Sequence, residues 1–400
     1  MLNIPEVLAS YNLKEITIGV LGGHSALEVC EGAKKLGFQT LVVAQKGREK
    51  TYEKYYRTRT HGAQQSANRE VGCVDHLITL DKFADIVKPE VQEELRGRST
   101  IFVHNRYFWV YCDFNAIEND FNVPIYGTRH LVRLEERDQP NNQYVLLEKA
   151  GIRIPKIIRT GEATVTGDAL KTVLDQHFDT NRGGPIIVKV NEATRTYERA
   201  FFVAVSTGDF EKKSKEMIAS GKITEEGLNK AVIEEFIIGA QVNLNFFYSP
   251  ITGELELMGT DMRRQTSLDG FLRLNADVQN ELLSSGYQSS MVETGHVSVT
   301  MKESLLEKAF DIGEKFVKAS QENAAPGILG PFALQGAVAA ENGREEFVIF
   351  DVSMRIPGSP GTRFTPYTSY LWGRSMSFGE RIALDIKEAL DSGRLSEIVT

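Results

Sequence analysis

Two segments near the C-terminal end bring an amide, a carboxylate and an arginine into a pattern that suits a metal ion and a phosphate. Residues 332–340 and 347–355 are strand-like runs separated by Glu-Asn-Gly-Arg, and Asn-Gly is a strong hairpin-turn signal. A turn centred on Gly343 places Gln335 opposite Asp351, with side chains about 5 Å apart. Amide and carboxylate oxygens, completed by phosphate oxygens, are ligands that Mg²⁺ prefers. The pair is therefore the predicted metal site.

The same hairpin offers two further polar side chains. Ser353 and Arg355 lie two and four residues beyond Asp351, so strand alternation turns all three toward one face. An arginine in that position could bind a phosphate or a substrate oxygen. These residues alone leave open the alternative that the face is simply solvated.

A lysine and a pair of acids end two apolar runs in the middle of the chain. Residues 185–190 carry Lys189, where a point cation could meet a phosphate, although an edge lysine is the simpler interpretation. Residues 231–239 form the second run, which contains two adjacent glutamates. Backbone groups at such a strand end could read adenine while a carboxylate holds an amino or hydroxyl group. The predicted adenine-reading segment is Glu234, Glu235, Phe236 and Ile237.

A glycine turn near the N-terminus predicts an anion site. It follows the strand-like residues 15–21 and precedes a helical pattern over residues 25–37, where Ser25 and Glu28 have the spacing of a capping box. The free N–H groups and positive dipole end of that helix suit a phosphate, with His24 at the mouth. A polar turn residue is an equally good interpretation of His24. The turn is not GxGxxG, so NAD binding is not favoured.

The elements that must position these residues predict an α/β chain. Its first third alternates strands with helices, which is typical of an open parallel sheet, and the predicted strands are residues 15–21, 40–44, 76–79 and 100–104. Polar residues 57–71 predict an inserted surface loop. The last third of the chain begins with an antiparallel hairpin of residues 242–249 and 254–259. We expect an N-terminal open parallel α/β domain and a two-lobed α+β domain, with units at residues 1–124, 125–235 and 236–400.

The composition of the chain limits the classes of molecule that it is expected to bind. The 400 residues carry a net charge of −8, which argues against a nucleic-acid coat because phosphate contacts along a polymer need a basic surplus. A nucleotide stays possible, because six cationic side chains could gather in one cleft: Lys189, Arg195, Arg199, Arg263, Arg264 and Arg355. Three scattered cysteines, Cys30, Cys73 and Cys112, form no CxxC and predict neither a disulfide scaffold nor a zinc site. No signal peptide and no run of about 20 apolar residues is evident, so we expect a cytoplasmic protein without a membrane partner.

The order of these motifs resembles the ATP-grasp superfamily and, within it, the archaeal formate-dependent FAICAR synthetases. Collinear similarity over nearly the whole chain implies that family's fold, a preATP-grasp domain followed by a two-lobed ATP-grasp domain. The segments that carry the resemblance are LGGHSAL, AQKGREKTYEKY, IEEFIIGAQVNLNFFYSPITGELELMGTDMRR, ILGPFALQG, FDVSMRI and SMSFGERIALDIKEAL.

The resemblance also implies a reaction. ATP and formate would give formyl phosphate, which the 5-amino group of AICAR ribonucleotide attacks, releasing ADP and phosphate. The implied cofactors are ATP and Mg²⁺ or Mn²⁺, and a homo-oligomer is implied as well. His24 matches the family's substrate-contacting histidine, with Ser25 beside it, while Lys189 and Arg355 would act on the phosphates.

Several ligand positions depart from the family's pattern. The family's glycine-rich phosphate loop is replaced by a glycine-free stretch over residues 189–202, where Arg195 and Arg199 could supply the missing donors. An ATP-contacting lysine aligns with Val145. The substrate-binding serine and asparagine align with Tyr107 and Ser267, and the magnesium glutamate with Asp351.

These departures leave two alternatives to FAICAR synthesis. One is an ATP-grasp enzyme that acts on another carboxylate and amine pair. The other is a nucleotide-binding subunit without turnover.

Overall fold

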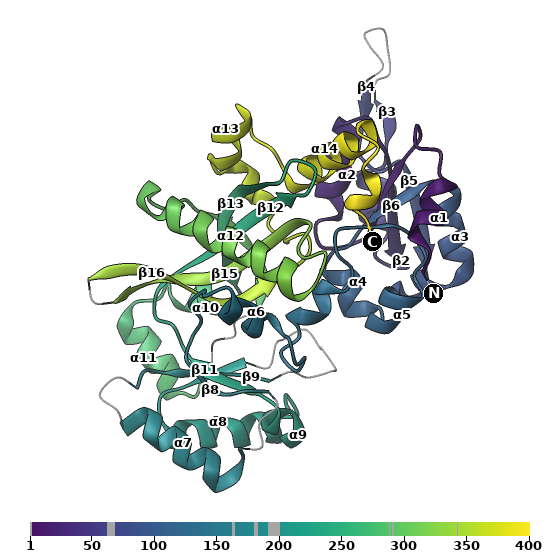
Figure 1. Ribbon diagram of the computed structural model, residues 1–400. Helices are drawn as coiled ribbons and strands as arrows, with labels where there is room; N and C mark the ends of the chain where they lie inside the picture. Colours follow the sequence, from purple (N-terminus) through teal and green to yellow (C-terminus); the bar gives the residue numbers. More distant parts are fainter. Residues whose placement is uncertain are drawn as a thin grey trace.

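Three sheets and a two-stranded ribbon organise the chain (Figure 1). The computed structural model describes residues 2–61, 69–161, 165–179, 183–190, 201–287, 289, 292–341 and 343–400. In Figure 1 the first sheet lies with the two chain ends, the third sheet occupies the middle of the molecule, and the second sheet forms a smaller lobe at its foot. The predicted α/β class is confirmed.

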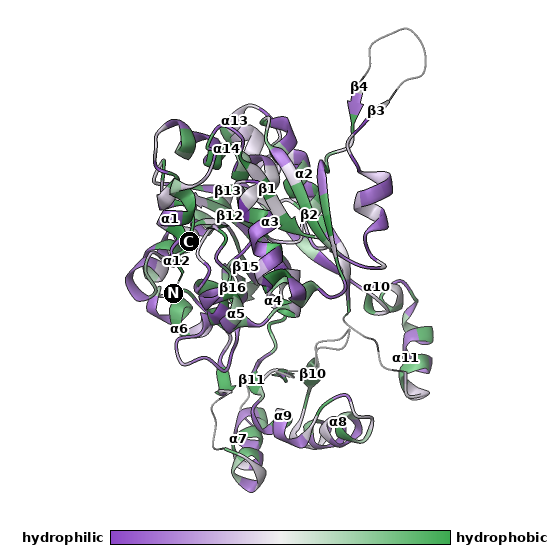
Figure 2. Ribbon diagram, turned by 90° about the vertical axis from the view of Figure 1, so that its right-hand side faces the viewer, coloured by the Kyte–Doolittle hydropathy of each residue, from purple (hydrophilic) through white to green (hydrophobic). Residues whose placement is uncertain are grey.

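The first sheet is parallel and buried on both faces. Its spatial order is β5-β2-β1-β6-β7, and β1 (Thr17–Leu21) is buried along its whole length. A parallel strand covered on both sides needs a continuous apolar run, which explains why the sequence signal was strong here. The other strands are β2 (Gln39–Gln45), β5 (His76–Leu80), β6 (Thr100–Val103) and β7 (Ile125–Tyr126). Figure 2 shows the strands around β2 as largely hydrophobic.

Helices from both ends of the chain cover this sheet. On one face α2 (Ala26–Lys35) packs against α14 (Phe378–Asp391), and the two helices touch at Gly32 and Gly379. A Cβ at Gly32 would lie 2.0 Å from the Gly379 carbonyl carbon, so only glycine permits this approach. The remaining helices of this part are α1 (Ile4–Ala9), α3 (Pro89–Gly97), α4 (Arg106–Tyr111) and α5 (Phe114–Asn119).

Two expectations about this part need correction. Residues 57–71 are not wholly irregular, because β3 (Arg59–His61) and β4 (Arg69–Val71) pair as an antiparallel ribbon. The boundary at residue 124 is also too early. Strand β7 begins at Ile125 and pairs with β6, and the Ile125 N–H donates to the Thr400 carbonyl at 2.9 Å. The first sheet therefore includes residues from beyond the predicted boundary and is closed by the C-terminus.

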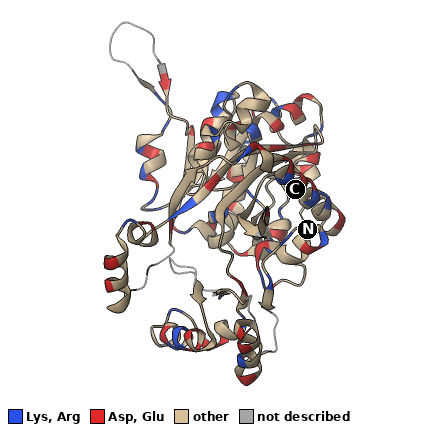
Figure 3. Cartoon of the chain, turned by 90° about the vertical axis from the view of Figure 1, so that its left-hand side faces the viewer, with Lys and Arg blue, Asp and Glu red and all other residues tan. Residues whose placement is uncertain are grey.

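The second sheet forms the small lobe. Its strands are antiparallel, in the order β10-β9-β11-β8, and β9 (Ile186–Lys189) lies inside it, so Lys189 is not an edge lysine. The other strands are β8 (Ile157–Arg159), β10 (Phe201–Ala204) and β11 (Val232–Glu235). Its helices are α7 (Gly167–Asp179), α8 (Thr207–Ala219) and α9 (Glu225–Asn229). Figure 3 shows both signs of charge interspersed over these helices at the foot of the molecule.

The third sheet carries the predicted metal hairpin. Its order is β14-β13-β12-β15-β16, all antiparallel. The long helix α12 (Leu306–Asn323) packs on it through Phe316, whose ring stacks on Phe332. The strands are β12 (Ala240–Ser249), β13 (Glu254–Gln265), β14 (Glu293–Ser298), β15 (Gly330–Glu341) and β16 (Arg344–Ser353).

The hairpin places Gln335 opposite Asp351, as predicted. The turn, however, is not centred on Gly343, because Glu341 pairs with Arg344; Asn342 lies outside the described residues. The register shifts between Gln335 and Gly336, which leaves Phe350 without an opposite residue. This bulge brings Asp351 into the position that a simple hairpin would have given to Phe350.

Smaller elements complete the chain. The helices are α6 (Gln143–Lys149), α10 (Leu268–Phe271), α11 (Ala276–Ser284) and α13 (Tyr367–Trp372). Single turns are η1 (Thr51–Tyr55), η2 (Phe83–Val87), η3 (Leu131–Glu135), η4 (Glu303–Leu305), η5 (Pro360–Phe364) and η6 (Leu395–Glu397). Among the helices in the described part of the chain, none has the length and apolarity to cross a membrane.

Candidate functional site

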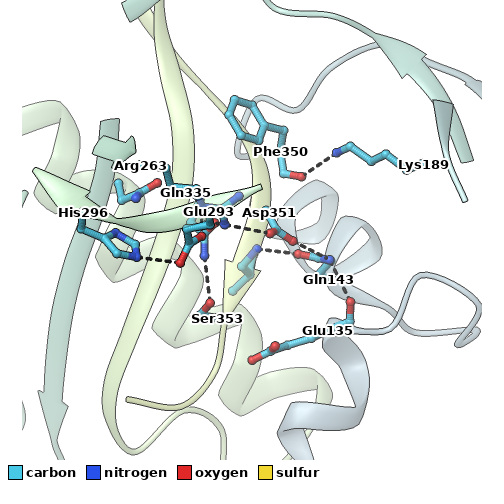
Figure 4. A network of polar contacts seen from close by, with 12 residues as sticks. Glu135, Gln143, Lys189, Arg263, Glu293, His296, Gln335, Phe350, Asp351 and Ser353 are labelled. Atoms are coloured by element: carbon cyan, nitrogen blue, oxygen red, sulfur yellow. Dashed lines mark hydrogen bonds and ion pairs between the residues drawn. The ribbon is translucent and has the colours of Figure 1, made fainter. Parts of the chain in front are cut away.

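The hairpin pair forms the centre of a buried polar network (Figure 4). Gln335 donates its amide N–H to Ser353 Oγ at 2.8 Å, and its amide oxygen accepts from Arg263. Asp351 Oδ1 accepts from Arg137 Nη2 at 2.8 Å and from Gln143 Nε2 at 3.3 Å. The two predicted metal ligands are therefore adjacent, buried and surrounded by cationic and amide donors.

Lys189 reaches the same hairpin from the small lobe. Its Nζ lies 2.5 Å from Glu234 Oε1 and donates to the Phe350 carbonyl at 3.1 Å and to Tyr144 Oη at 2.9 Å. Both charged side chains are almost fully buried. Burial is the main reason why the pKa of Lys189 falls to about 8, and Arg137 adds to that effect while Glu234 opposes it. The lysine strand and the metal hairpin thus share one site.

The predicted adenine-reading segment makes its contacts with the Lys189 strand and with other parts of the small lobe. Glu234 lies against Lys189 and accepts a hydrogen bond from Tyr144 Oη at 2.5 Å, and its role at the nucleoside stays a prediction. The Glu235 N–H donates to the Lys156 carbonyl at 3.0 Å and the Phe236 N–H to the Pro185 carbonyl at 2.8 Å. Two backbone donors expected to read adenine are used within the small lobe. A role for Ile237 stays a prediction.

A histidine bound to two carboxylates borders the hairpin on the other side. His296 on β14 lies 2.5 Å from Asp261 through Nδ1 and 3.0 Å from Glu293 through Nε2. Burial alone would lower the pKa of His296, but its bonds to both carboxylates raise that pKa to about 9. Arg263 Nε lies 3.1 Å from Glu293. The same guanidinium contacts Gln335 and Asp351, so Arg263 links the histidine and its carboxylates to the hairpin.

The bonds of His296 to Asp261 and Glu293 predict a pH-dependent contribution to the free energy of unfolding. Because the pKa of His296 rises from 6.5 in the unfolded chain to about 9 in the folded one, its stabilisation is complete below pH 6.5 and is lost as pH rises through 9. We expect His296→Gln to lower the free energy of unfolding more at pH 6 than at pH 10, measured by urea denaturation. An equal loss at both pH values would contradict the assignment.

The glycine turn at the N-terminal domain lies close to the same site. Asn105 Nδ2 donates to the Leu21 and His24 carbonyls, both at 2.8 Å, and this fixes the turn. The His24 ring stacks with Tyr107, with centroids 6.5 Å apart, and covers Gly358, where a Cβ would lie 1.6 Å from His24 Nε2. Burial, followed by the charge of Arg355, lowers the pKa of His24 to about 3. The imidazole is therefore neutral at physiological pH.

The predicted capping box at this helix is wrong. Ser25 has a left-handed backbone conformation with φ of 65°, and its hydroxyl donates to the Pro357 carbonyl at 2.8 Å instead of capping the helix. Glu28 accepts from the Phe378 N–H at 3.1 Å. Both side chains bind the C-terminal part of the chain, so the predicted cap is replaced by contacts between domains.

Arg355 connects the turn with the hairpin. It is buried just after β16, where its Nη2 lies 3.8 Å from Glu135 Oε2, and its charge acts on His24. Burial raises the pKa of Glu135, although Arg355 opposes this effect. A small open pocket reaches these groups, and its lining is Arg106, Trp109, Val110, Phe114, Val132, Glu135, Glu136 and Arg355.

Other predicted residues are not brought into these contacts. Ser267 lies in the turn after β13 with φ of 56°, and its substrate role stays a prediction. Arg264 is mostly exposed and lies 3.9 Å from Asp269. Arg195 and Arg199 lie outside the described residues.

Several residues of the site were not identified from the sequence. Asp261 lies two residues before Arg263 on β13, and only Arg263 was expected in the cationic cleft. Asn243 and Asn245 have the same spacing on β12, and both asparagines donate to Asp261, at 2.9 and 2.6 Å. Polar residues at every second position of apolar strands were a usable signal. The segment with Glu135, Arg137, Gln143 and Tyr144 gave no such signal, because a loop and a short helix bring it to the hairpin.

Comparisons with known proteins decide the family. Two family models match, one described as a protein of unknown function (DUF1246) over residues 18–158 and one as a domain of unknown function (DUF1297) over residues 209–400. A relative from Methanothermobacter thermautotrophicus, named 5-formaminoimidazole-4-carboxamide-1-(beta)-D-ribofuranosyl 5'-monophosphate synthetase, is 37% identical over 400 residues, covering 99% of this chain and 98% of the relative. The chain belongs to this synthetase family. A synthetase of the same name from Methanopyrus kandleri is 34% identical and covers the same shares.

Solved structures agree on the fold. The IMP biosynthesis protein PurP from Thermococcus kodakaraensis matches with a TM-score of 0.65 and 24% identity, covering 96% of this chain and all of that chain. An N5-carboxyaminoimidazole synthase from Aspergillus clavatus, solved with ADP and 5-aminoimidazole ribonucleotide, matches with a TM-score of 0.53 and 16% identity over 88% of this chain and 73% of that one. The ATP-grasp architecture expected of the synthetase family is confirmed.

Proposed function

We propose that this chain joins formate to the 5-amino group of AICAR ribonucleotide at the expense of ATP, forming FAICAR through formyl phosphate. The observation that supports this most is that one site collects residues from all three parts of the chain: His24, Lys189 and Asp351. Family membership supplies the substrates, since the relatives are named as FAICAR synthetases. Nucleotide use is further supported by solved neighbours that contain ADP.

The hairpin offers two oxygen donors that suit Mg²⁺ when phosphates supply the other ligands. Gln335 and Asp351 offer oxygens from adjacent strands, and two guanidinium groups, from Arg137 and Arg263, already lie against them. A position that attracts two cationic side chains suits a cation, and one or two protein ligands are sufficient when phosphates supply the rest. Bound there, Mg²⁺ or Mn²⁺ would neutralise charge on the transferred phosphate.

The chain's own residues orient the three substrates. Lys189 and Arg355 supply positive charge at the phosphates, where electrostatic stabilisation is the main catalytic contribution expected in phosphoryl transfer. Formate attacks the γ-phosphorus as the bond to ADP breaks, and the amine then attacks the formyl carbon as phosphate leaves with the C–O bonding electrons. Neutral His24 can accept a hydrogen bond from the amine and orient it, and the departing phosphate can take the proton that the amine loses. Ser25 and Tyr107 lie beside it, and we assign them to the AICAR side of the site.

Incubation of the purified protein with ATP, formate, AICAR ribonucleotide and MgCl₂ tests the proposal. We expect a formylated ribonucleotide of the FAICAR mass in a one-to-one ratio with released phosphate. Omission of formate is expected to abolish the product. Phosphate release that requires another carboxylate or another amine would favour a different substrate pair, and nucleotide binding without any phosphate release would favour a binding subunit.

A further inference from the structure

The side chain of Arg137 lies in the site, but the proposed reaction gives it no role toward a substrate. It lies between η3 and α6, where its backbone carbonyl accepts from Asn142 Nδ2 at 3.0 Å. Its guanidinium lies between two aromatic rings, 5.9 Å from the centroid of Tyr144 and 5.8 Å from that of Phe201 on β10. The side chain is 13% exposed, and its buried Nε has no hydrogen-bond partner among the described residues. Arg137 is thus held in place, and its Nε–H is available to an acceptor.

Arg137 shares its carboxylate with another cation. Asp351 is shared, with Arg137 Nη2 at 2.8 Å from one oxygen and Arg263 Nη2 at 3.5 Å from the other. Lys189 lies near enough for the charge of Arg137 to oppose its protonation. Burying three cations together is costly unless anions accompany them. Glu234 pairs with Lys189 and Glu293 pairs with Arg263, whereas Asp351 serves both Arg137 and Arg263 and, in the proposed reaction, the metal ion. A metal ion bound to Asp351 would therefore leave Arg137 in need of another anion.

We propose that Arg137 is a nucleotide-phosphate ligand of this chain. Its planar fork of N–H donors matches two phosphate oxygens, and cation–π contacts with two rings keep it oriented while it changes partner. In the nucleotide-bound protein the guanidinium leaves Asp351 for the phosphates of ADP or ATP, which frees that carboxylate for the metal ion. This inference rests on the proposed function, because it assumes that the site takes a nucleoside polyphosphate.

Nucleotide titrations of the full-length protein test the proposal. Calorimetric dissociation constants for ATP, ADP and adenosine would be compared among the wild type, Arg137→Met, Arg137→Gln and the control Arg133→Met. Glutamine at position 137 can still donate to Asp351 but carries no charge, so it separates phosphate binding from a structural role. Arg133 is a matched control, because it precedes the same segment, pairs with Glu118 at 2.7 Å and lies over the Phe114 ring.

We expect both Arg137 variants to bind ATP and ADP at least about tenfold more weakly, with adenosine affinity unchanged, while Arg133→Met binds like the wild type. Without nucleotide, Arg137→Met should bind Mn²⁺ more tightly than the wild type, measured by electron paramagnetic resonance. Equal ATP affinity in Arg137→Gln and the wild type would overturn the inference, as would a parallel loss of adenosine binding. Failure of the wild type itself to bind ATP would instead contradict the proposed function.

Discussion

Replacing Asp351 with asparagine is expected to reduce FAICAR formation by about 10²–10³-fold, because the change removes the charge that holds the metal ion and keeps the shape of the side chain. Arg137 and Gln143 contact Oδ1 of Asp351, and Arg263 lies near Oδ2. The other predicted metal ligand, Gln335, is neutral, so it cannot replace the lost charge. The measurement is the initial rate of product formation at saturating ATP, formate and AICAR ribonucleotide.

Glu346→Gln provides the control for Asp351→Asn. Glu346 lies on the same strand and pairs with Lys308 at 2.9 Å, but this pair is partly exposed and distant from the hairpin bulge. Its rate is expected to match the wild type. Asp351→Asn protein with a normal thermal midpoint and a rate within a few-fold of the wild type would exclude Asp351 as the metal ligand.

Replacing Lys189 with methionine is expected to have the largest effect on stability. Lys189 and Glu234 are 4% and 1% exposed, so the substitution leaves a buried carboxylate without its cation. Breaking such a pair by removing one partner costs about 3–5 kcal/mol. Urea denaturation at pH 7 would measure the loss in the free energy of unfolding. The double variant Lys189→Met with Glu234→Gln should recover most of it, because neither buried charge remains.

The exposed pair of Lys230 and Glu226, with Nζ and Oε1 2.6 Å apart on α9 and its C-terminal cap, is the comparison for Lys189. Lys230→Met is expected to leave the free energy of unfolding nearly unchanged, since solvent screens surface pairs. A loss of similar size at both lysines would mean that the Lys189 pair is hydrated. No recovery in the double variant would mean that the lysine contributes through its contacts with Tyr144 and Phe350.

The strands of this chain were predictable because their burial leaves a direct trace in the sequence. β1 and β9 are apolar along most of their length, since both faces are covered. The helix that follows β1 ends at Lys35, and Gly37, just beyond its cap, has φ of 86°, which explains why glycine stands there. The cap at Ser25 failed for a reason that local spacing does not contain: residues more than 300 positions away, Pro357 and Phe378, bind the side chains that would have closed it.

The site was predictable only where strand register decides geometry. Gln335 and Asp351 were paired correctly, although a bulge at Phe350, which the sequence did not signal, was needed to align them. Lys189 was found from the end of its strand, but its contact with Glu234 was not, because the pairing of β9 with β11 was not known. Arg137 was missed, since a loop outside any periodic element delivers it.

The central claim is that formate is activated as formyl phosphate in the site shared by His24, Lys189 and Asp351. The most direct test supplies formate labelled with oxygen-18 at both oxygens and follows the label by mass spectrometry in the presence of ATP, AICAR ribonucleotide and the wild-type protein. We predict one labelled oxygen in the released phosphate and one in the formyl group of the product. Phosphate without label, formed while product accumulates, would contradict the account.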